Sequence, residues 1–252
     1  MIFVEMMKSR YDLRDNFTWT WEDVLGIFEK KENGAVKEEW EKKKKSYYSI
    51  LSTIKGNKEN KEKDYYVATT NYTDIAETVI GKKPIYLHGN LSWFEDYERL
   101  VVYDCTIKEE RETARERAEE HMIFPYIMIP SGVKPLICKK QIEEYHKFID
   151  ALNKSNKLCV VGYKFNKEDN HINSIIGEWL RQRDHKLYYY YYNEEKKSEE
   201  EVFDTLPTCI KDGNSLGDSG NKKPGNVIIS RICKENCYDK FEKFVGENFL
   251  IG

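Results

Sequence analysis

The sequence predicts an α/β fold in which a mostly parallel, Rossmann-like sheet is flanked by helices and preceded by a helical N-terminal region. From residue 64 onward, short runs rich in β-branched and aromatic residues alternate with amphipathic segments. Such alternation is typical of βαβ units, which build parallel sheets covered by helices. Before residue 64, apolar residues recur at three- and four-residue spacing, which indicates helices. We therefore expect residues 1–63 to be a helical part of the same domain and residues 64–252 to form the α/β core.

The N-terminal region contains two predicted amphipathic helices, at 19–30 and 36–54, each with an apolar face. The polar run KGNKENKEKD at 55–64 then ends the helical pattern. We interpret the lysine runs at 42–45 and 58–63 as solvated surface, because acidic and amide residues flank or interrupt them.

The core is predicted to alternate strands with helices. The strand-like runs are DYYVATT, KPIYLH, RLVVYD, KLCVVGY, HKLYYYYYN and NVIISRI. Helix candidates lie between or after them, at 74–79, 107–121, 139–153, 170–183 and 238–249. A stretch rich in Gly, Asn and Ser at 211–226 is expected to be a surface loop. In a sheet of this kind, ligands bind outside the carboxyl ends of the strands.

Composition bounds the class of protein. The chain has 252 residues, of which 40% are hydrophobic, enough for one sizeable core. Its 41 basic and 44 acidic side chains leave a net charge of -3, so a nucleic-acid partner is not expected. The apolar runs are too short to cross a bilayer, and the N-terminus lacks the pattern of a secretory leader. We expect a cytoplasmic protein with no membrane partner.

The six cysteines are scattered, without the paired spacing of a zinc site. Cys159 lies in an apolar run, where a free thiol behaves as a small hydrophobic residue. Cys233 and Cys237 could supply two metal ligands, but a structural zinc site needs four. No metal site is predicted.

Polar residues follow four of the predicted strands. They are Thr69, Thr70 and Asn71, then His88, then Gly162, and finally Asn193. Each has a plainer interpretation as well: the threonines could cap the next helix, the histidine could be structural, and the tyrosine run before Asn193 could pack its rings on both faces of the sheet. His171 and Asn173 likewise fit the first turn of a helix, with Asp169 or Asn170 as its N-cap.

Taken in order, four segments resemble the SIR2-like family of NAD-consuming domains, which includes the sirtuins and bacterial defence NAD hydrolases. The segments are TTNYTDIAE at 69–77, YLHG at 86–89, FPYIMIPSGVKPLI at 124–137 and LCVVGYKFNKEDNHINSII at 158–176. The resemblance covers about residues 64–195, and its most distinctive piece is GYKFNKEDNHINSII.

The resemblance implies roles for particular residues. Asn71 falls on the family's asparagine that contacts the nicotinamide ribose and orders the attacking water, and His88 falls on its catalytic histidine. Both suit the chemistry, since histidine titrates near neutral pH and asparagine both donates and accepts hydrogen bonds. The expected cofactor-binding residues are Thr69, Thr70, Gly162, Lys164 and Asn193, and NAD is the expected substrate.

This sequence also departs from the family pattern. The family opens with a strand and a Gly-Ala-Gly loop that holds the pyrophosphate, whereas the first glycine here is Gly26. We therefore expect the opening strand, loop and helix to be missing, and the chain alone to bind NAD poorly. Thr73 stands where sirtuins have Asp, and Lys164 stands where they have Ser. That lysine could meet a phosphate or point to solvent. No four-cysteine zinc lobe is present, so protein deacylation is not expected.

Two functions are predicted on this basis. The first is a SIR2-like NAD hydrolase that yields nicotinamide and ADP-ribose, in the manner of an antiphage defence effector, active as a complete or assembled form. The resemblance implies a homo-oligomer and a separate sensor or ATPase subunit as its partners. The alternative is a non-catalytic SIR2-like scaffold or a subunit that senses an ADP-ribose-type ligand.

Overall fold

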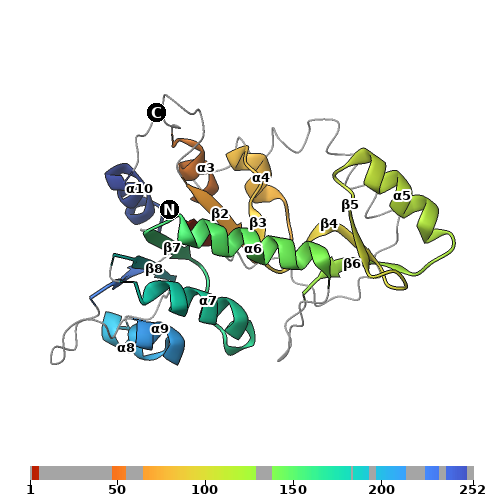
Figure 1. Cartoon of the computed structure of the whole chain (residues 1–252). Helices are drawn as coiled ribbons and strands as arrows, with labels where there is room; N and C mark the ends of the chain where they lie inside the picture. The colour runs from red at the N-terminus through yellow and green to blue at the C-terminus, as the bar shows by residue number, and fades with distance from the viewer. Residues whose placement is uncertain are drawn as a thin grey trace.

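The computed structural model describes eight stretches of the chain: 2–5, 47–54, 65–128, 138–182, 184–192, 197–213, 225–232 and 237–248. Its main feature is a six-stranded sheet in the order β3-β2-β1-β7-β8-β9 (Figure 1). These strands are Ile2–Glu5, Tyr66–Thr69, Ile85–Tyr86, Lys157–Val161, Lys186–Tyr192 and Val227–Ile232, for β1, β2, β3, β7, β8 and β9. Every neighbouring pair is parallel, so the predicted parallel sheet is confirmed.

The strand order is that of a doubly wound fold. Numbered within this sheet alone, the order is 3-2-1-4-5-6, because the chain first moves outward from β1 to β3 and then returns to β7 beside β1. The order reverses between β1 and β7, and sheets of this type bind ligands at that point, outside the carboxyl ends of the strands. The predicted Rossmann-like class is therefore observed.

The expectation that the opening strand is missing is wrong. Residues 2–5 form β1, which lies between β2 and β7 at the centre of the sheet. The run Ile-Phe-Val-Glu is short and continuously apolar before its last residue, as is typical of strands in parallel sheets, and it carries no alternation that would reveal it. The residues after β1, 6–46, lie outside the described part, so the structure gives no account of the phosphate loop or of the predicted helix at 19–30.

Two helical layers cover the sheet. On one face, side chains of α6 (Lys139–Asn153), α7 (Asn170–Leu180), α8 (Glu199–Asp204) and α9 (Thr208–Gly213) share a core with the strands. On the other face, α3 (Tyr47–Ser52), α4 (Ile75–Ile80) and α10 (Cys237–Asn248) form a second core. The predicted helices of the core recur within a few residues, and α6 has the predicted bounds; α8 and α9 were not predicted.

Strand β8 shows how the sheet divides its side chains between these cores. Leu187 and Tyr189 pack into the core beneath α6 and α7, whereas Tyr190 packs into the core beneath α3 and α10 with Tyr188 against it. The tyrosine run therefore places rings on both faces, as predicted. Cys159 in β7 is fully buried with a free thiol, in keeping with its interpretation as a small hydrophobic residue.

A smaller antiparallel sheet lies beyond β3, at the end of the molecule where α6 begins (Figure 1). Its order is β5-β4-β6, with β4 at Gly89–Asp96, β5 at Val101–Asp104 and β6 at Ile123–Ile127, and α5 (Lys108–Ala118) packs on it. The predicted strand at 99–104 thus belongs to this sheet, because the short turn after β4 can only make an antiparallel hairpin. Pro125 fits β6 because that strand is an edge.

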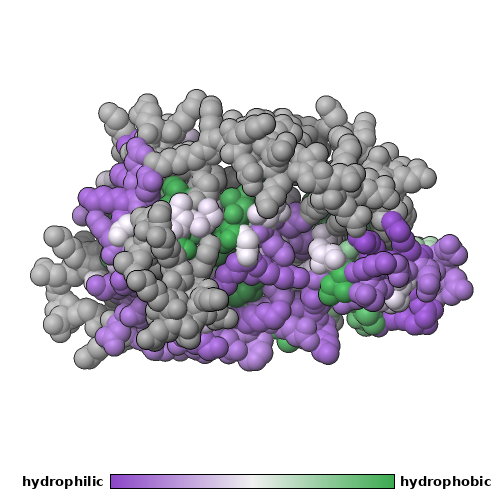
Figure 2. Space-filling view, turned by 90° about the horizontal axis from the view of Figure 1, so that it is seen from above, coloured by the Kyte–Doolittle hydropathy of each residue, from purple (hydrophilic) through white to green (hydrophobic). Residues whose placement is uncertain are grey.

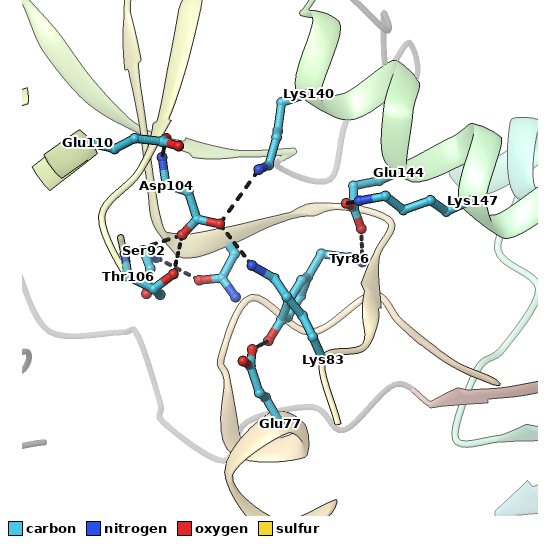
Figure 3. A network of polar contacts seen from close by, with 11 residues as sticks. Glu77, Lys83, Tyr86, Ser92, Asp104, Thr106, Glu110, Lys140, Glu144 and Lys147 are labelled. Atoms are coloured by element: carbon cyan, nitrogen blue, oxygen red, sulfur yellow. Dashed lines mark hydrogen bonds and ion pairs between the residues drawn. The ribbon is translucent and has the colours of Figure 1, made fainter. Parts of the chain in front are cut away.

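A buried ionic network fixes the small sheet to the large one (Figure 3). Asp104, at the end of β5, is fully buried. Its Oδ2 lies 2.9 Å from Lys83 Nζ and 3.6 Å from Lys140 Nζ, and its Oδ1 accepts a hydrogen bond from the Thr106 hydroxyl at 2.6 Å. Lys83 precedes β3 and Lys140 lies on α6, so one carboxylate joins three elements.

The surface is mainly polar where the structure describes it. Figure 2 shows the face seen from above the view of Figure 1, where hydrophilic residues cover most of the described surface and smaller hydrophobic areas lie between them. None of the described helices is both long enough and apolar enough to cross a membrane.

Candidate functional site

The carboxyl ends of the strands place most of the predicted site residues along one edge of the large sheet. Register aligns Tyr86, Thr69, Glu5 and Val161 in one row, at the ends of β3, β2, β1 and β7. Asn71, His88 and Gly162 each follow within two residues of this row. Three residue types that were predicted from separate strands therefore share the edge where doubly wound folds bind ligands.

The segment after β2 is folded back on itself. Thr69 is buried, and its hydroxyl accepts a hydrogen bond from the Asn71 amide nitrogen at 3.0 Å. Asn71 is half-buried, and its side-chain amide donates to the Tyr48 hydroxyl at 3.4 Å. The N-cap of α4 is Asp74, so the interpretation that the threonines cap this helix is wrong. The turn instead holds Asn71 at the sheet edge.

Thr70, the next residue, is buried, and its hydroxyl oxygen has no hydrogen-bond partner among the described residues. Because an unsatisfied buried hydroxyl costs free energy, it is a group that a bound water or ligand would stabilise.

His88 is held by its neighbours on both sides. The Leu87 carbonyl accepts hydrogen bonds from Gln141 Nε2 at 2.8 Å and from the Tyr145 hydroxyl at 3.1 Å. The His88 carbonyl accepts from the Met128 amide at 2.7 Å. Gly89 follows with φ +89°, and a Cβ there would lie 2.3 Å from the Tyr126 carbonyl oxygen, so only glycine fits. These contacts fix the position of the His88 backbone, from which the imidazole side chain extends.

The His88 side chain is almost fully buried and faces a carboxylate. Its Nε2 lies 3.1 Å from Oδ1 of Asp169, which is also buried. Asp169 ends a short 3-10 helix at Lys167–Asp169 and occupies the N-cap position of α7, yet its side chain makes no capping hydrogen bond. The prediction that Asp169 or Asn170 is the N-cap is confirmed for Asp169 by position. The Asp169 carboxylate does not bond the helix, however, and faces the histidine from another segment of the chain.

In addition to burial, the negative charge of Asp169 raises the pKa of three nearby tyrosines. Burial raises the pKa of Tyr72, Tyr145 and Tyr163, and the Asp169 carboxylate adds to the increase in each case. The Tyr72 hydroxyl donates to the carbonyl of Met128 at 2.6 Å, and the amide of the same Met128 donates to the His88 carbonyl. These three side chains stay protonated near neutral pH, so they can donate hydrogen bonds but cannot serve as bases there.

His171, in the first turn of α7, completes the cluster. Its ring centroid lies 6.3 Å from that of His88 and 5.5 Å from that of Tyr145. One ligand-type atom from each of His88, Asp169 and His171 lies within 4.8 Å of the other two. Asn173, by contrast, is structural: it accepts from the Tyr163 hydroxyl at 2.7 Å and donates to the Asn166 carbonyl at 2.8 Å.

The turn after β7 has a strained backbone. Gly162 has φ +73° and Phe165 has φ +52°, which a phenylalanine rarely adopts. The side chain of Phe165 is buried against Tyr163 and Tyr189, and this packing offsets the cost. Lys164 lies in the same turn and is exposed, so solvent or a phosphate can reach its ammonium group. The predicted Asn193 lies outside the described residues.

The sequence predicted that Asn71 and His88 follow strands at the sheet edge, but it did not predict that the Asp169 carboxylate faces His88. The signal was present, since Asp169 and His171 follow a predicted strand in the polar segment KEDNHI. A helix start explained both residues locally, and only the tertiary fold brings them to His88.

Fold and site together define a doubly wound α/β domain with a buried histidine and aspartate pair at the edge where sheets of this type bind ligands. No family model and no curated protein match the chain. Among solved structures it is similar to a sirtuin studied for its substrate affinity, with 14% identity over 82% of this chain and 73% of that one and a TM-score of 0.43.

Two further similarities are to Sir2 structures with bound ligands. One is Sir2 with an inhibitor, 2'-O-acetyl-ADP-ribose and a deacetylated p53 peptide, at 14% identity over 98% of this chain and 91% of that one, with a TM-score of 0.45. The other is a Sir2 homologue in complex with NAD, at 8% identity over 79% and 63%, with a TM-score of 0.43.

Proposed function

We propose that the chain is a SIR2-like domain that binds NAD at the carboxyl edge of its large sheet and hydrolyses it to nicotinamide and ADP-ribose. The observation that supports this best is the buried pair of His88 and Asp169 at the edge where a doubly wound sheet binds nucleotides, with Asn71 following the neighbouring strand at the same edge. The resemblance of the sequence segments that carry these residues points to the same substrate.

The chemistry that this site would perform is the displacement of nicotinamide by water. The bond between the ribose C1′ and the ring nitrogen breaks, and its electron pair neutralises the cationic ring of the leaving group. The water oxygen bonds to C1′, and one water proton must be removed. Because the transition state has oxocarbenium character, the reaction depends on positioning and on stabilisation of positive charge.

His88 is proposed to be the base that accepts this proton. When its Nε2–H donates to Asp169, the lone pair of the neutral ring is on Nδ1, and Nδ1 takes the proton. The Asp169 carboxylate then stabilises the imidazolium that forms and keeps the ring in one tautomer. Asn71, held by the turn after β2, is proposed to orient the water or the ribose hydroxyls. Thr69, Thr70, Gly162, Lys164 and Asn193 are proposed to contact the nucleotide.

The biological setting belongs to the same proposal. The enzyme would act in the cytoplasm as an antiphage defence effector, as a homo-oligomer and with a separate sensor or ATPase subunit. This part rests on the sequence resemblance alone.

A non-catalytic scaffold or sensor of an ADP-ribose-type ligand is a second candidate, and one observation favours it. β1 ends at Glu5, and the sequence that follows has no glycine before Gly26. Backbone amides of a glycine-rich loop are the usual pyrophosphate site at this position, so a nucleotide here would depend on other contacts.

The experiment is to incubate the purified chain with NAD and follow nicotinamide and ADP-ribose by chromatography. We expect His88→Ala to reduce cleavage by about 100-fold or more, the contribution of a general base. His146→Ala is the matched control, because His146 is exposed on α6 and also faces a carboxylate, with its Nε2 3.8 Å from Asp150. Full cleavage by the His88 variant would refute the assignment. Binding of ADP-ribose with no cleavage would favour the second candidate.

A further inference from the structure

The cluster of His88, Asp169 and His171 has the composition of a transition-metal site. Within the described residues it is the group of histidine and acidic side chains whose ligand atoms converge, all within 4.8 Å of one another. Two imidazoles with one carboxylate suit Zn²⁺ and its neighbours in the first transition row, whereas Mg²⁺ and Ca²⁺ prefer oxygen ligands alone. The residue types therefore select the class of metal.

The distances fit a metal after a small adjustment. Metal–nitrogen and metal–oxygen bonds of about 2.0–2.2 Å in a tetrahedral site put neighbouring ligand atoms roughly 3.3–3.5 Å apart. His88 Nε2 and Asp169 Oδ1, at 3.1 Å, are already near this value. The remaining pairs, which are no more than 4.8 Å apart, need to close by up to about 1.5 Å, which side-chain rotation of the half-buried His171 would supply.

The ligands also stand on fixed backbone from distant parts of the chain. His88 is held at the end of β3 by the hydrogen bonds to Leu87 and from Met128. The Asp169 amide donates to the Asn166 carbonyl at 3.0 Å, and His171 lies within α7 with its ring against Tyr145. Sites whose ligands are fixed in this way bind metal without having to reorder the chain.

We infer that the chain binds one divalent transition-metal ion of the Zn²⁺ type through His88 Nε2, a carboxylate oxygen of Asp169 and a ring nitrogen of His171. Three protein ligands leave a fourth position for water or another small ligand. This site goes beyond the proposed hydrolase and does not depend on it.

One consequence does rest on the proposed function. A metal on His88 Nε2 leaves the ring proton on Nδ1, so the base needed for NAD cleavage is lost while the metal is bound. The metal would therefore inhibit the hydrolase, and removing it with a chelator would restore activity.

The metal site is tested without NAD. The full chain is stripped with a chelator and titrated with Co²⁺, with d–d absorption in the visible region as the signal for imidazole and carboxylate coordination. We expect one Co²⁺ per chain, displaced by Zn²⁺, and at least about tenfold weaker binding in Asp169→Asn and in His171→Ala. His171→Gln, which keeps size and polarity, covers the case in which the alanine variant fails to fold.

The control is a second histidine between carboxylates. His121 Nδ1 lies 2.7 Å from Glu98 and its Nε2 lies 4.0 Å from Glu120, near the surface of the small sheet. His121→Ala is expected to leave Co²⁺ binding unchanged. The inference is overturned if the stripped chain gives no Co²⁺ spectrum, or if the spectrum survives in the Asp169 and His171 variants. Because no NAD is present, failure here says nothing against the hydrolase, and loss of NAD cleavage says nothing against the metal.

Discussion

Two buried aspartates, one in the small sheet and one at the edge of the large sheet, have different partners. Asp104 in the small sheet lies between the ammonium groups of Lys83 and Lys140 and accepts the Thr106 hydroxyl. Asp169 at the edge of the large sheet faces His88 and lies beside His171. Lysine ammonium groups stay charged across the physiological range, whereas imidazoles gain and lose a proton within it.

The difference indicates what each region is for. Burial by itself would raise the pKa of Asp104, but hydrogen bonds from Thr106 and Lys83 and the charges of both lysines outweigh it and lower that pKa. Such a site is permanently charged and joins elements. A carboxylate next to imidazoles is instead an arrangement in which protons or metal ions can exchange, which suits chemistry.

The largest expected effect is on stability, from removal of the structural carboxylate. Asp104→Ala should lower the free energy of unfolding by about 3 kcal/mol, the lower end for breaking a buried ion pair. The lower end applies because Lys83 and Lys140 are partly exposed and can be rehydrated. Urea denaturation followed by circular dichroism measures it. A loss as small as that of a surface substitution would show that the network does not hold the two sheets together.

The matching change at the large sheet should act on chemistry. Asp169→Asn keeps the shape of the side chain but removes its charge, so it should slow NAD cleavage by about 100-fold, within the range that a general base contributes. Asp150→Asn, next to the exposed His146, is the control and should leave the rate unchanged. If Asp169→Asn lowered stability as much as Asp104→Ala while sparing the rate, the contrast between the two sites would fail.

The stabilising contribution of Asp104 should depend on pH. Because the folded-state pKa of Asp104 is lowered, its stabilising contribution is present above the unfolded value of about 3.9 and is lost as the pH falls through the folded-state pKa. The difference in unfolding free energy between wild type and Asp104→Asn should therefore be full near neutral pH and shrink below about pH 4. Denaturation curves at several pH values test this, and a constant difference would contradict it.

Local pattern was enough to predict most elements of the large sheet. In α6, buried Glu144, Tyr145, Phe148, Ala151 and Leu152 recur at helical spacing, and its predicted bounds are those observed. β4 was not predicted, because the buried residues of Gly89–Asp96 do not alternate with exposed ones. Its sequence therefore shows neither the two-residue period of a half-buried strand nor the period of a helix. β1 was not predicted, because three apolar residues in a row carry no period. Only their pairing with β2 and β7 identifies them as a strand.

The residues of the candidate site also differ in how far local sequence predicts their positions. Asn71 and His88 could be predicted because each follows an apolar strand, and parallel strands bring their carboxyl ends together. Asp169 could not, since a residue at the start of a helix either caps it or turns elsewhere, and its sequence neighbours do not decide which. What decided it was the position of His88, which follows β3 in an earlier part of the chain.

The smallest expected effect concerns the support of His88. Tyr145→Phe removes the hydroxyl that donates to the Leu87 carbonyl, but Gln141 Nε2 still donates to the same oxygen at 2.8 Å. The loss of stability should therefore be about 1 kcal/mol, the net value of one hydrogen bond. Gln141→Leu leaves the tyrosine as the sole side-chain donor and should cost a similar amount. The double variant leaves the buried carbonyl without either side-chain donor, so it should cost more than the sum of the two single changes, as thermal unfolding would measure. Strict additivity would mean that this carbonyl does not depend on the pair, and that the Met128 amide is what holds the backbone of His88.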